Sequence, residues 1–230
     1  LAEQDKWFGA FVQDDWKVNS RLTLTLGIRV DLNGSPFERY DRLNRSFDPK
    51  AENPVNSLVN RTRFPELPVL RGGLLFAGVG GVPRNASNLD ITTFQPRLGF
   101  AYQLTQKMVW RGGIGRYYLN PNNDYLQFTG YSASTPLVNS LDGGRTAIPN
   151  LLNNPFPDGV TVPPGSSQGL LTFVGRGFNF FDPTFKVPYV NQFSLGFQYE
   201  LPSRSSLEVS YVGNRTYKLE SDFAYNEPDL

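Results

Sequence analysis

The chain has 230 residues, with Lys+Arg 22 against Asp+Glu 21, a formal net charge of +1, and neither cysteine nor histidine. The lack of cysteine excludes disulfides and thiolate metal sites, and the lack of histidine excludes histidine-dependent nucleophile systems and the commonest metal ligand. The balanced charge argues against a nucleic-acid partner, which requires a clustered positive excess.

Alternation of apolar and polar residues, the pattern of a β-strand, recurs six times along the chain, in three pairs. The pairs predict three β-hairpins, at residues 7–32, 96–119 and 189–217, each with two strands of about ten residues joined by a few polar residues. The run RLTLTLGIRVDL in the first hairpin shows the pattern most clearly, because it has an apolar residue at every second position. Such a strand has one apolar face and one polar face.

The connections between the hairpins are long, at residues 33–95 and 119–188, and they carry most of the prolines and asparagines. Short turns therefore alternate with long loops, so all long loops are expected at one end of the sheet. This layout is typical of outer-membrane barrels, which have short periplasmic turns and long extracellular loops. The sequence predicts an all-β fold of antiparallel meander hairpins, about six strands that form part of a transmembrane β-barrel without closing it.

A soluble β-sandwich would show the same alternation, because its inner faces are also apolar. Three features favour the membrane. The candidate strands match the roughly 9–11 residues of a tilted membrane strand, and their polar faces are rich in Thr, Gly, Ser and Gln, which suits a water-filled or plug-filled lumen. Large aromatic residues also lie near the strand ends, as in an aromatic girdle, with Trp16 and Trp110 by the short turns and Tyr118 and Tyr189 by the long loops.

The two faces give two sets of candidate residues. The residues expected to face lipid are Leu22, Leu24, Leu26, Leu98, Phe100, Phe193, Leu195 and Phe197. The residues expected to face the lumen and to contact a plug or a solute are Arg29, Arg97, Arg111 and Glu200. The alternative for the second set is that these side chains form ion pairs that only tune stability.

No motif indicates catalysis. The run GGIGRYY at residues 112–118 lacks the GxGxxG spacing of a dinucleotide site and suits strand glycines better. Three loop acids, Asp124, Asp142 and Asp158, could ligate calcium, but solvated carboxylates are the simpler interpretation. We therefore expect no enzyme activity, no cofactor and no metal site.

The hairpins resemble those of a known family. FGAFVQDDWKVNSRLTLTLGIRVDLNG, FQPRLGFAYQLTQKMVWRGGIGRYY and VPYVNQFSLGFQYELPSRSSLEVSYVGNR are similar to barrel hairpins of TonB-dependent outer-membrane receptors, and the last run points to the Oar-like branch. The resemblance covers all six strands, whereas the loops match little. It implies a barrel of about 22 strands around an N-terminal plug, in the outer membrane of a Gram-negative-type bacterium.

The same resemblance implies partners and a function. The partners are outer-membrane lipid, the rest of the barrel with its plug domain, and the TonB energy-transducing complex, reached through a part that this chain lacks. Residues 1–230 are expected to be a segment of the receptor barrel that takes up a large solute or handles a peptide or protein. Two alternatives stay open, a non-transporting outer-membrane adhesin or structural barrel and a soluble β-sandwich binding module or glycan hydrolase.

Overall fold

A computed structural model describes residues 2–119, 126–149, 153–156, 158–222, 224 and 225. The chain divides into two compact units. The loop unit comprises Leu1–Gln4, Pro36–Ser87 and Asp124–Pro183, and the sheet unit comprises Asp5–Ser35, Asn88–Asn123 and Thr184–Leu230. None of the helices in the described residues is long and apolar enough to cross a bilayer.

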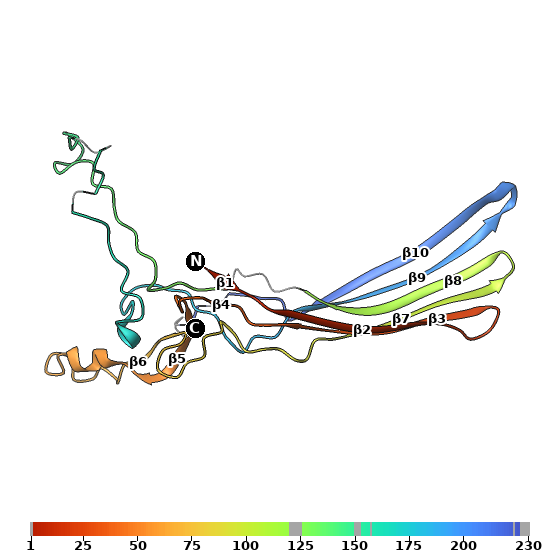
Figure 1. Cartoon of the computed structure of the whole chain (residues 1–230), viewed down its shortest axis with the longest axis horizontal. Helices are drawn as coiled ribbons and strands as arrows, with labels where there is room; N and C mark the ends of the chain where they lie inside the picture. The colour runs from red at the N-terminus through yellow and green to blue at the C-terminus, as the bar shows by residue number, and fades with distance from the viewer. Residues whose placement is uncertain (1, 120–125, 150–152, 157, 223, 226–230) are drawn as a thin grey trace. The chain divides into compact units, whose positions relative to one another are not determined.

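The sheet unit contains one six-stranded antiparallel sheet in the order β10-β9-β8-β7-β3-β2 (Figure 1). Its strands have 11 to 13 residues, long enough for the roughly 9–11 that a tilted membrane strand requires. The bounds are β2 Trp7–Lys17, β3 Leu22–Asn33, β7 Phe94–Thr105, β8 Met108–Tyr118, β9 Tyr189–Leu201 and β10 Ser205–Tyr217. The prediction of an all-β, antiparallel and unclosed sheet is therefore confirmed.

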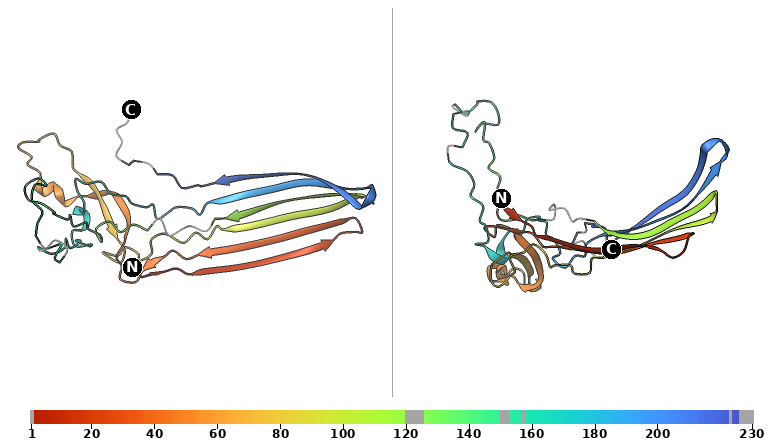
Figure 2. Two further views of the ribbon diagram at one scale, coloured as in Figure 1. Left: turned by 90° about the horizontal axis from the view of Figure 1, so that it is seen from above. Right: turned by 45° about the vertical axis from the view of Figure 1, so that its right-hand side comes forward.

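The three hairpins lie close to their predicted bounds. The first and second hairpins extend over Trp7–Asn33 and Phe94–Tyr118, so each boundary differs by two residues at most, and the third matches residues 189–217. A short 3-10 turn, η4 at Pro202–Arg204, joins β9 to β10. All three short turns lie at one end of the sheet, and both long connections leave from the other end (Figures 1 and 2).

The strand register gives the sheet one apolar face. Leu24 pairs with Phe100, Phe100 with Gly112 and Gly112 with Leu195, and residues paired across strands share a face. All eight residues that were predicted to face lipid project from this apolar face. None of the eight is buried, and Leu195 is 52% exposed.

No second layer of the sheet unit covers this face. Among its described residues, Val187 is the single buried hydrophobic one. A soluble sandwich of this size would bury many large side chains between two sheets. The apolar face therefore has no core of its own to pack against within its unit.

The loop unit is the part of the fold that the sequence did not predict. It contains two small antiparallel sheets, β1 (Glu3–Gln4) with β4 (Phe37–Glu38) and β5 (Asn44–Glu52) with β6 (Arg71–Phe76), and the 3-10 turns η1 (Pro54–Leu58) and η3 (Gly169–Leu171). Its buried apolar side chains are Leu43, Leu74, Phe76, Ala77, Ala86 and Leu126. The long connections are thus packed together in part and do not only extend as loops.

Two buried polar side chains hold this unit together. The Asn53 amide donates hydrogen bonds to the carbonyls of Gly72 at 2.7 Å and Leu170 at 2.8 Å, and so joins the two long connections. The fully buried Glu38 accepts hydrogen bonds from three backbone N–H groups, those of Ala2, Tyr40 and Arg42. Burial alone would raise the pKa of Glu38, but these hydrogen bonds hold its pKa below the ordinary value.

Candidate functional site on the polar face of the sheet

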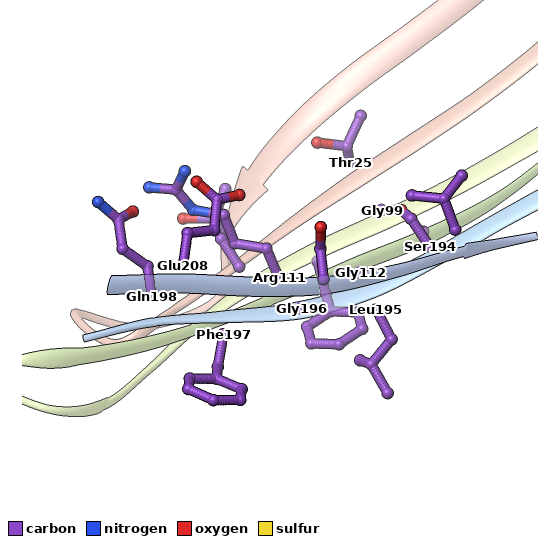
Figure 3. Close-up of a pocket in the computed structure, with 16 residues that line it drawn as sticks. Thr25, Gly99, Arg111, Gly112, Ser194, Leu195, Gly196, Phe197, Gln198 and Glu208 are labelled. Carbon is purple, nitrogen blue, oxygen red and sulfur yellow. The ribbon is translucent and has the colours of Figure 1, made fainter. Parts of the chain in front are cut away.

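The polar face of the sheet is hollowed by a trough of about 540 Å³ that extends across β3, β7, β8, β9 and β10. In Figure 3 the side chains of Thr25, Arg111, Gln198 and Glu208 project from one side of these strands, whereas those of Leu195 and Phe197 project from the other. Because the hollow lies on the polar side, this face is concave. Small residues along its floor, Gly99, Gly113, Ser194 and Gly196, leave the space open.

A second hollow of about 180 Å³ lies between β2, β3 and β7 and is lined by Arg29 and Arg97. Gly27 is a neighbour of both arginines, since it pairs with Arg97 and precedes Arg29 by two residues. The Arg29 guanidinium forms an ion pair of 2.7 Å with Asp31. It also lies 5.7 Å from the ring centre of Trp7 and 6.0 Å from that of Phe11.

Arg97 is held by a different set of neighbours. Its guanidinium lies 5.0 Å from the ring centre of Tyr117. The Tyr117 ring lies over Gly115, where an added Cβ would come within 2.9 Å of the ring and its hydroxyl oxygen. Gly115 is therefore required for the position of the Tyr117 ring, and through it for that of Arg97.

Two polar atoms near these arginines are buried without a hydrogen-bond partner, Nε of Arg97 and Oδ1 of Asp31. The other carboxylate oxygen of Asp31 accepts hydrogen bonds from Arg29 and from the Gln95 amide. A buried polar group without a partner is costly, and native proteins rarely leave one unpaired. Both atoms are closed off by the side chains around them, so the two arginines are held in a crowded polar cluster.

The four predicted lumen residues all project from the polar face, but the structure places them in three locations. Arg29 and Arg97 line the smaller hollow, and Arg111 lines the trough. Glu200 lies away from both, next to the turn between β9 and β10, where its N–H donates to the Lys107 carbonyl at 2.8 Å. Glu208 contributes the acid of the trough instead, and its place in the alternation of SLEVSY could have indicated this.

Large aromatic residues on the polar face were not predicted. Trp7 and Phe11 are 60% and 73% exposed and lie on the same side of the sheet as Arg29, because Phe11 pairs directly with Arg29. The alternation of β2 is mixed, so its sequence alone does not show which face these rings take. The pairing with β3 decides it.

The four predicted girdle residues project from the apolar face. Trp16 and Trp110 lie near the short turns, and Tyr118 and Tyr189 lie at the end from which the long connections leave. This face also carries three charged residues that the sequence did not indicate. They are Asp14 on β2, Arg116 on β8 and Arg215 on β10.

One family model matches the whole chain. Its description is an outer membrane beta barrel domain, and the match covers residues 1–230. The chain belongs to this family of outer membrane beta barrel domains. No curated protein and no solved structure matches the chain significantly.

Membership in the outer membrane beta barrel domain family indicates the environment of the two faces. The chain is a protein of the bacterial outer membrane, and its association with membrane lipid follows. Outer-membrane barrels have an apolar outer band between two aromatic girdles and a polar interior. The segregated faces of the sheet unit have this arrangement.

The ends of the two long connections meet at Asp90, just before β7. The buried Asp90 carboxylate accepts hydrogen bonds from Thr92 N at 3.0 Å and Val187 N at 3.1 Å, and Lys186 Nζ lies 3.4 Å away. Burial alone would raise the pKa of Asp90, but the hydrogen bonds and Lys186 together hold its pKa below the ordinary value. Asp90 thus fixes residues 90–92 to the chain that enters β9.

The three loop acids considered as calcium ligands have different surroundings, and Asp158 is exposed in its loop. Asp142 accepts hydrogen bonds from Ser140 Oγ, Arg145 N and Thr146 N, and these bonds lower its pKa well below the ordinary value. Asp124 lies outside the described residues. Within the described part of the chain, no group of three or more acidic side chains is placed to hold a metal ion.

Proposed function

We propose that the chain forms six neighbouring strands in the barrel wall of a TonB-dependent outer-membrane receptor of the Oar-like type. The observation that carries this proposal is the sheet itself, with strands of 11 to 13 residues, an uncovered apolar face and a hollowed polar face. The motifs of the three hairpins supply the finer assignment to TonB-dependent receptors. In this role the chain helps to form a pathway for a bulky solute, a peptide or a protein and carries out no chemistry.

In the proposed orientation the short turns face the periplasm and the long connections face the cell exterior, as in other outer-membrane barrels. The apolar face then contacts acyl chains. The lipid-facing set includes Leu26, Leu98 and Leu195, which are all at least 42% exposed. The concave polar face borders the lumen.

A plug in the lumen accounts for the polar face. Arg29 and Arg97 line the smaller hollow of this face, where their guanidinium groups would meet the plug. Arg111 and Glu208 face the same lumen from the trough. Coupling to a TonB protein in the periplasm belongs to parts of the receptor beyond these six strands.

A non-transporting adhesin or structural barrel is the second candidate function. The observation that favours it is the loop unit, because a packed core with Leu43, Leu74 and Phe76 is more than a connection between strands requires. A folded unit of this kind can present a binding surface to a partner outside the cell. A TonB-dependent receptor requires a plug and energy coupling through TonB, whereas a non-transporting barrel requires neither.

The decisive experiment uses the full-length protein. It is expected in the outer-membrane fraction, with heat-modifiable migration on gels, and it is expected to bind the purified periplasmic domain of a TonB protein. Outer-membrane localisation without TonB binding would favour the adhesin. Recovery in the soluble fraction would contradict both proposals.

A further inference from the structure

The long-loop end of the apolar face carries an ordered group of basic and aromatic side chains. Two rows extend across β8, β9 and β10. Arg116 pairs with Asn191 and Asn191 with Arg215, and one step further Tyr118 pairs with Tyr189 and Tyr189 with Tyr217. We call these six residues, together with Lys218 directly after β10, the rim cluster.

The tyrosines of the rim cluster hold its cations in place. Tyr189 and Tyr217 stack with ring centres 5.1 Å apart and an angle of 18°, and the Tyr118 ring centre lies 5.4 Å from that of Tyr189. The Arg116 guanidinium lies 4.2 Å from the Tyr189 ring centre, and its Nε donates to Asn191 Oδ1 at 3.0 Å. Arg215 lies 5.2 Å from the ring centre of Tyr217, and Lys218 lies 5.7 Å from that of Tyr189.

The positive charge of this cluster has no acid opposite it on the sheet. The apolar face of β7, β8, β9 and β10 bears no Asp or Glu, and the single acid on that face in the six strands, Asp14, lies on β2, three strands away from β8. The acid that faces Tyr118 is the loop residue Asp90, which is already bonded to Thr92 and Val187 and lies beside Lys186. The bonded partners of Arg116 are neutral.

Two arginines on a lipid-facing surface are costly unless their heads reach polar groups, since Arg at the bilayer midplane costs about 2–4 kcal/mol and less near the interface. Arginine side chains solve this by extending toward the headgroups. Here the guanidinium of Arg116 lies over the ring of Tyr189, one row nearer the long-loop end. The tyrosine row marks the interface, so the cations lie at headgroup depth.

We propose that the rim cluster binds the phosphorylated headgroup of a lipid in the outer leaflet. Arg116 and Arg215 are two strands apart, about 10 Å, so they can contact two phosphates of one headgroup. Arginine matches phosphate oxygens with paired N–H donors, and the Asn191 amide and the tyrosine hydroxyls supply neutral polar contacts. The proposal rests on the proposed function through the orientation that places the long loops outside the cell.

The test uses the full-length protein in detergent. It is mixed with micelles that contain bisphosphorylated lipid A, with the same micelles plus an excess of inorganic phosphate, or with micelles of the lipid after removal of its phosphates, and retained lipid per protein is measured. Wild type should retain the bisphosphorylated lipid equally well with and without inorganic phosphate, and it should not retain the dephosphorylated lipid. The double variant Arg116→Gln/Arg215→Gln should bind about thirty-fold more weakly, since each basic residue near an anionic membrane surface contributes about five-fold.

Two further variants make the result specific. Arg204→Gln is the matched control, because it removes one exposed positive charge at the short-turn end of the sheet, and it should leave retention unchanged. Arg116→Lys/Arg215→Lys keeps the charge but loses the paired N–H donors, so it should bind more weakly than wild type and more tightly than the double glutamine variant. Lys218→Gln, outside the strands, should weaken binding about five-fold without affecting folding, so the test stands even if the arginine variants fail to fold.

Equal retention by wild type and by the folded double glutamine variant would overturn the proposal. Equal competition by inorganic phosphate would also overturn it, since the site would then bind the free ion. Failure of the proposed function looks different, because protease added to intact cells would not cleave the long connections. If protease cleaves those loops and the folded double glutamine variant retains as much lipid as wild type, only the rim site is rejected.

Discussion

Placing one arginine at Leu195 and one at Ser194 gives the sharpest test of the two faces. These residues are neighbours at the middle of β9, the 13-residue strand Tyr189–Leu201, and they project from opposite sides of the sheet. Leu195 is the seventh residue of the strand. At about 3.3 Å per residue and a tilt near 40°, six residues on either side place it roughly 15 Å from each strand end along the membrane normal.

Leu195→Arg therefore places a charge near the bilayer midplane. The expected loss of folding free energy is about 2–4 kcal/mol. Ser194→Arg places the same side chain in the trough on the polar face, next to open space, and should cost less than about 1 kcal/mol. The introduced side chain is the same in both variants, so the difference reports the environment of the face together with the loss of the leucine side chain.

The measurement is reversible urea unfolding of the full-length protein in lipid vesicles, supported by the yield of heat-modifiable protein in the outer membrane. The midpoint for Leu195→Arg should fall clearly below that of wild type, and that for Ser194→Arg should stay near it. An equal effect of the two substitutions, or a larger effect at Ser194, would refute the assignment of the apolar face to lipid.

Three other predictions concern single contacts. Gly34→Ala should cost about 1–3 kcal/mol, because a Cβ there would lie 2.6 Å from the Lys6 carbonyl oxygen, whereas Gly27→Ala, with its nearest atoms at 3.5 Å, should be nearly neutral in the same urea assay. Asp90→Asn should destabilise the ends of the long connections by about 1.5–3 kcal/mol at pH 7. Because the pKa of Asp90 is lowered in the folded protein, its contribution to stability is full above about pH 4 and is lost as the pH falls through the pKa of the folded state. Limited proteolysis between pH 7 and pH 3 should show this loss in wild type and not in the variant. Asn53→Ala should raise amide exchange around Leu170 by removing two buried hydrogen bonds, whereas Ser57→Ala, which removes one exposed hydrogen bond, should not.

The sheet was predictable from the sequence because a period of two residues is a local signal. In RLTLTLGIRVDL the position of each residue in the alternation assigns it to a face, whichever strand lies beside it. The short turns fix which strands pair. The same reasoning places Arg29, Arg97 and Arg111 on the polar face from the sequence alone. It also places Glu200 on that face but does not give its distance from the hollows, because location along a strand relative to a hollow depends on the register of the neighbouring strands.

The loop unit could not be predicted because its contacts are not local. Its core joins Leu43, Leu74 and Leu126, which are far apart in the sequence and belong to no periodic run. The rim cluster is a similar case. Arg116 and Arg215 interrupt the apolar alternation of β8 and β10, and only the register brings them to either side of Asn191.

The open edges of the sheet lead to a last prediction. Among the described residues, β2 and β10 each pair with one strand only, so about half of the backbone N–H and C=O groups in strands of 11 and 13 residues face outward. Each such group costs several kcal/mol in hydrocarbon, so the total is on the order of 100 kcal/mol, far above the roughly 5–15 kcal/mol by which a folded protein is stable. The six strands must therefore pair with further strands in the membrane. Residues 1–230 expressed alone in detergent should form oligomers or aggregate, and a stable monomer with a heat-modifiable band would show that the edges are satisfied in some other way.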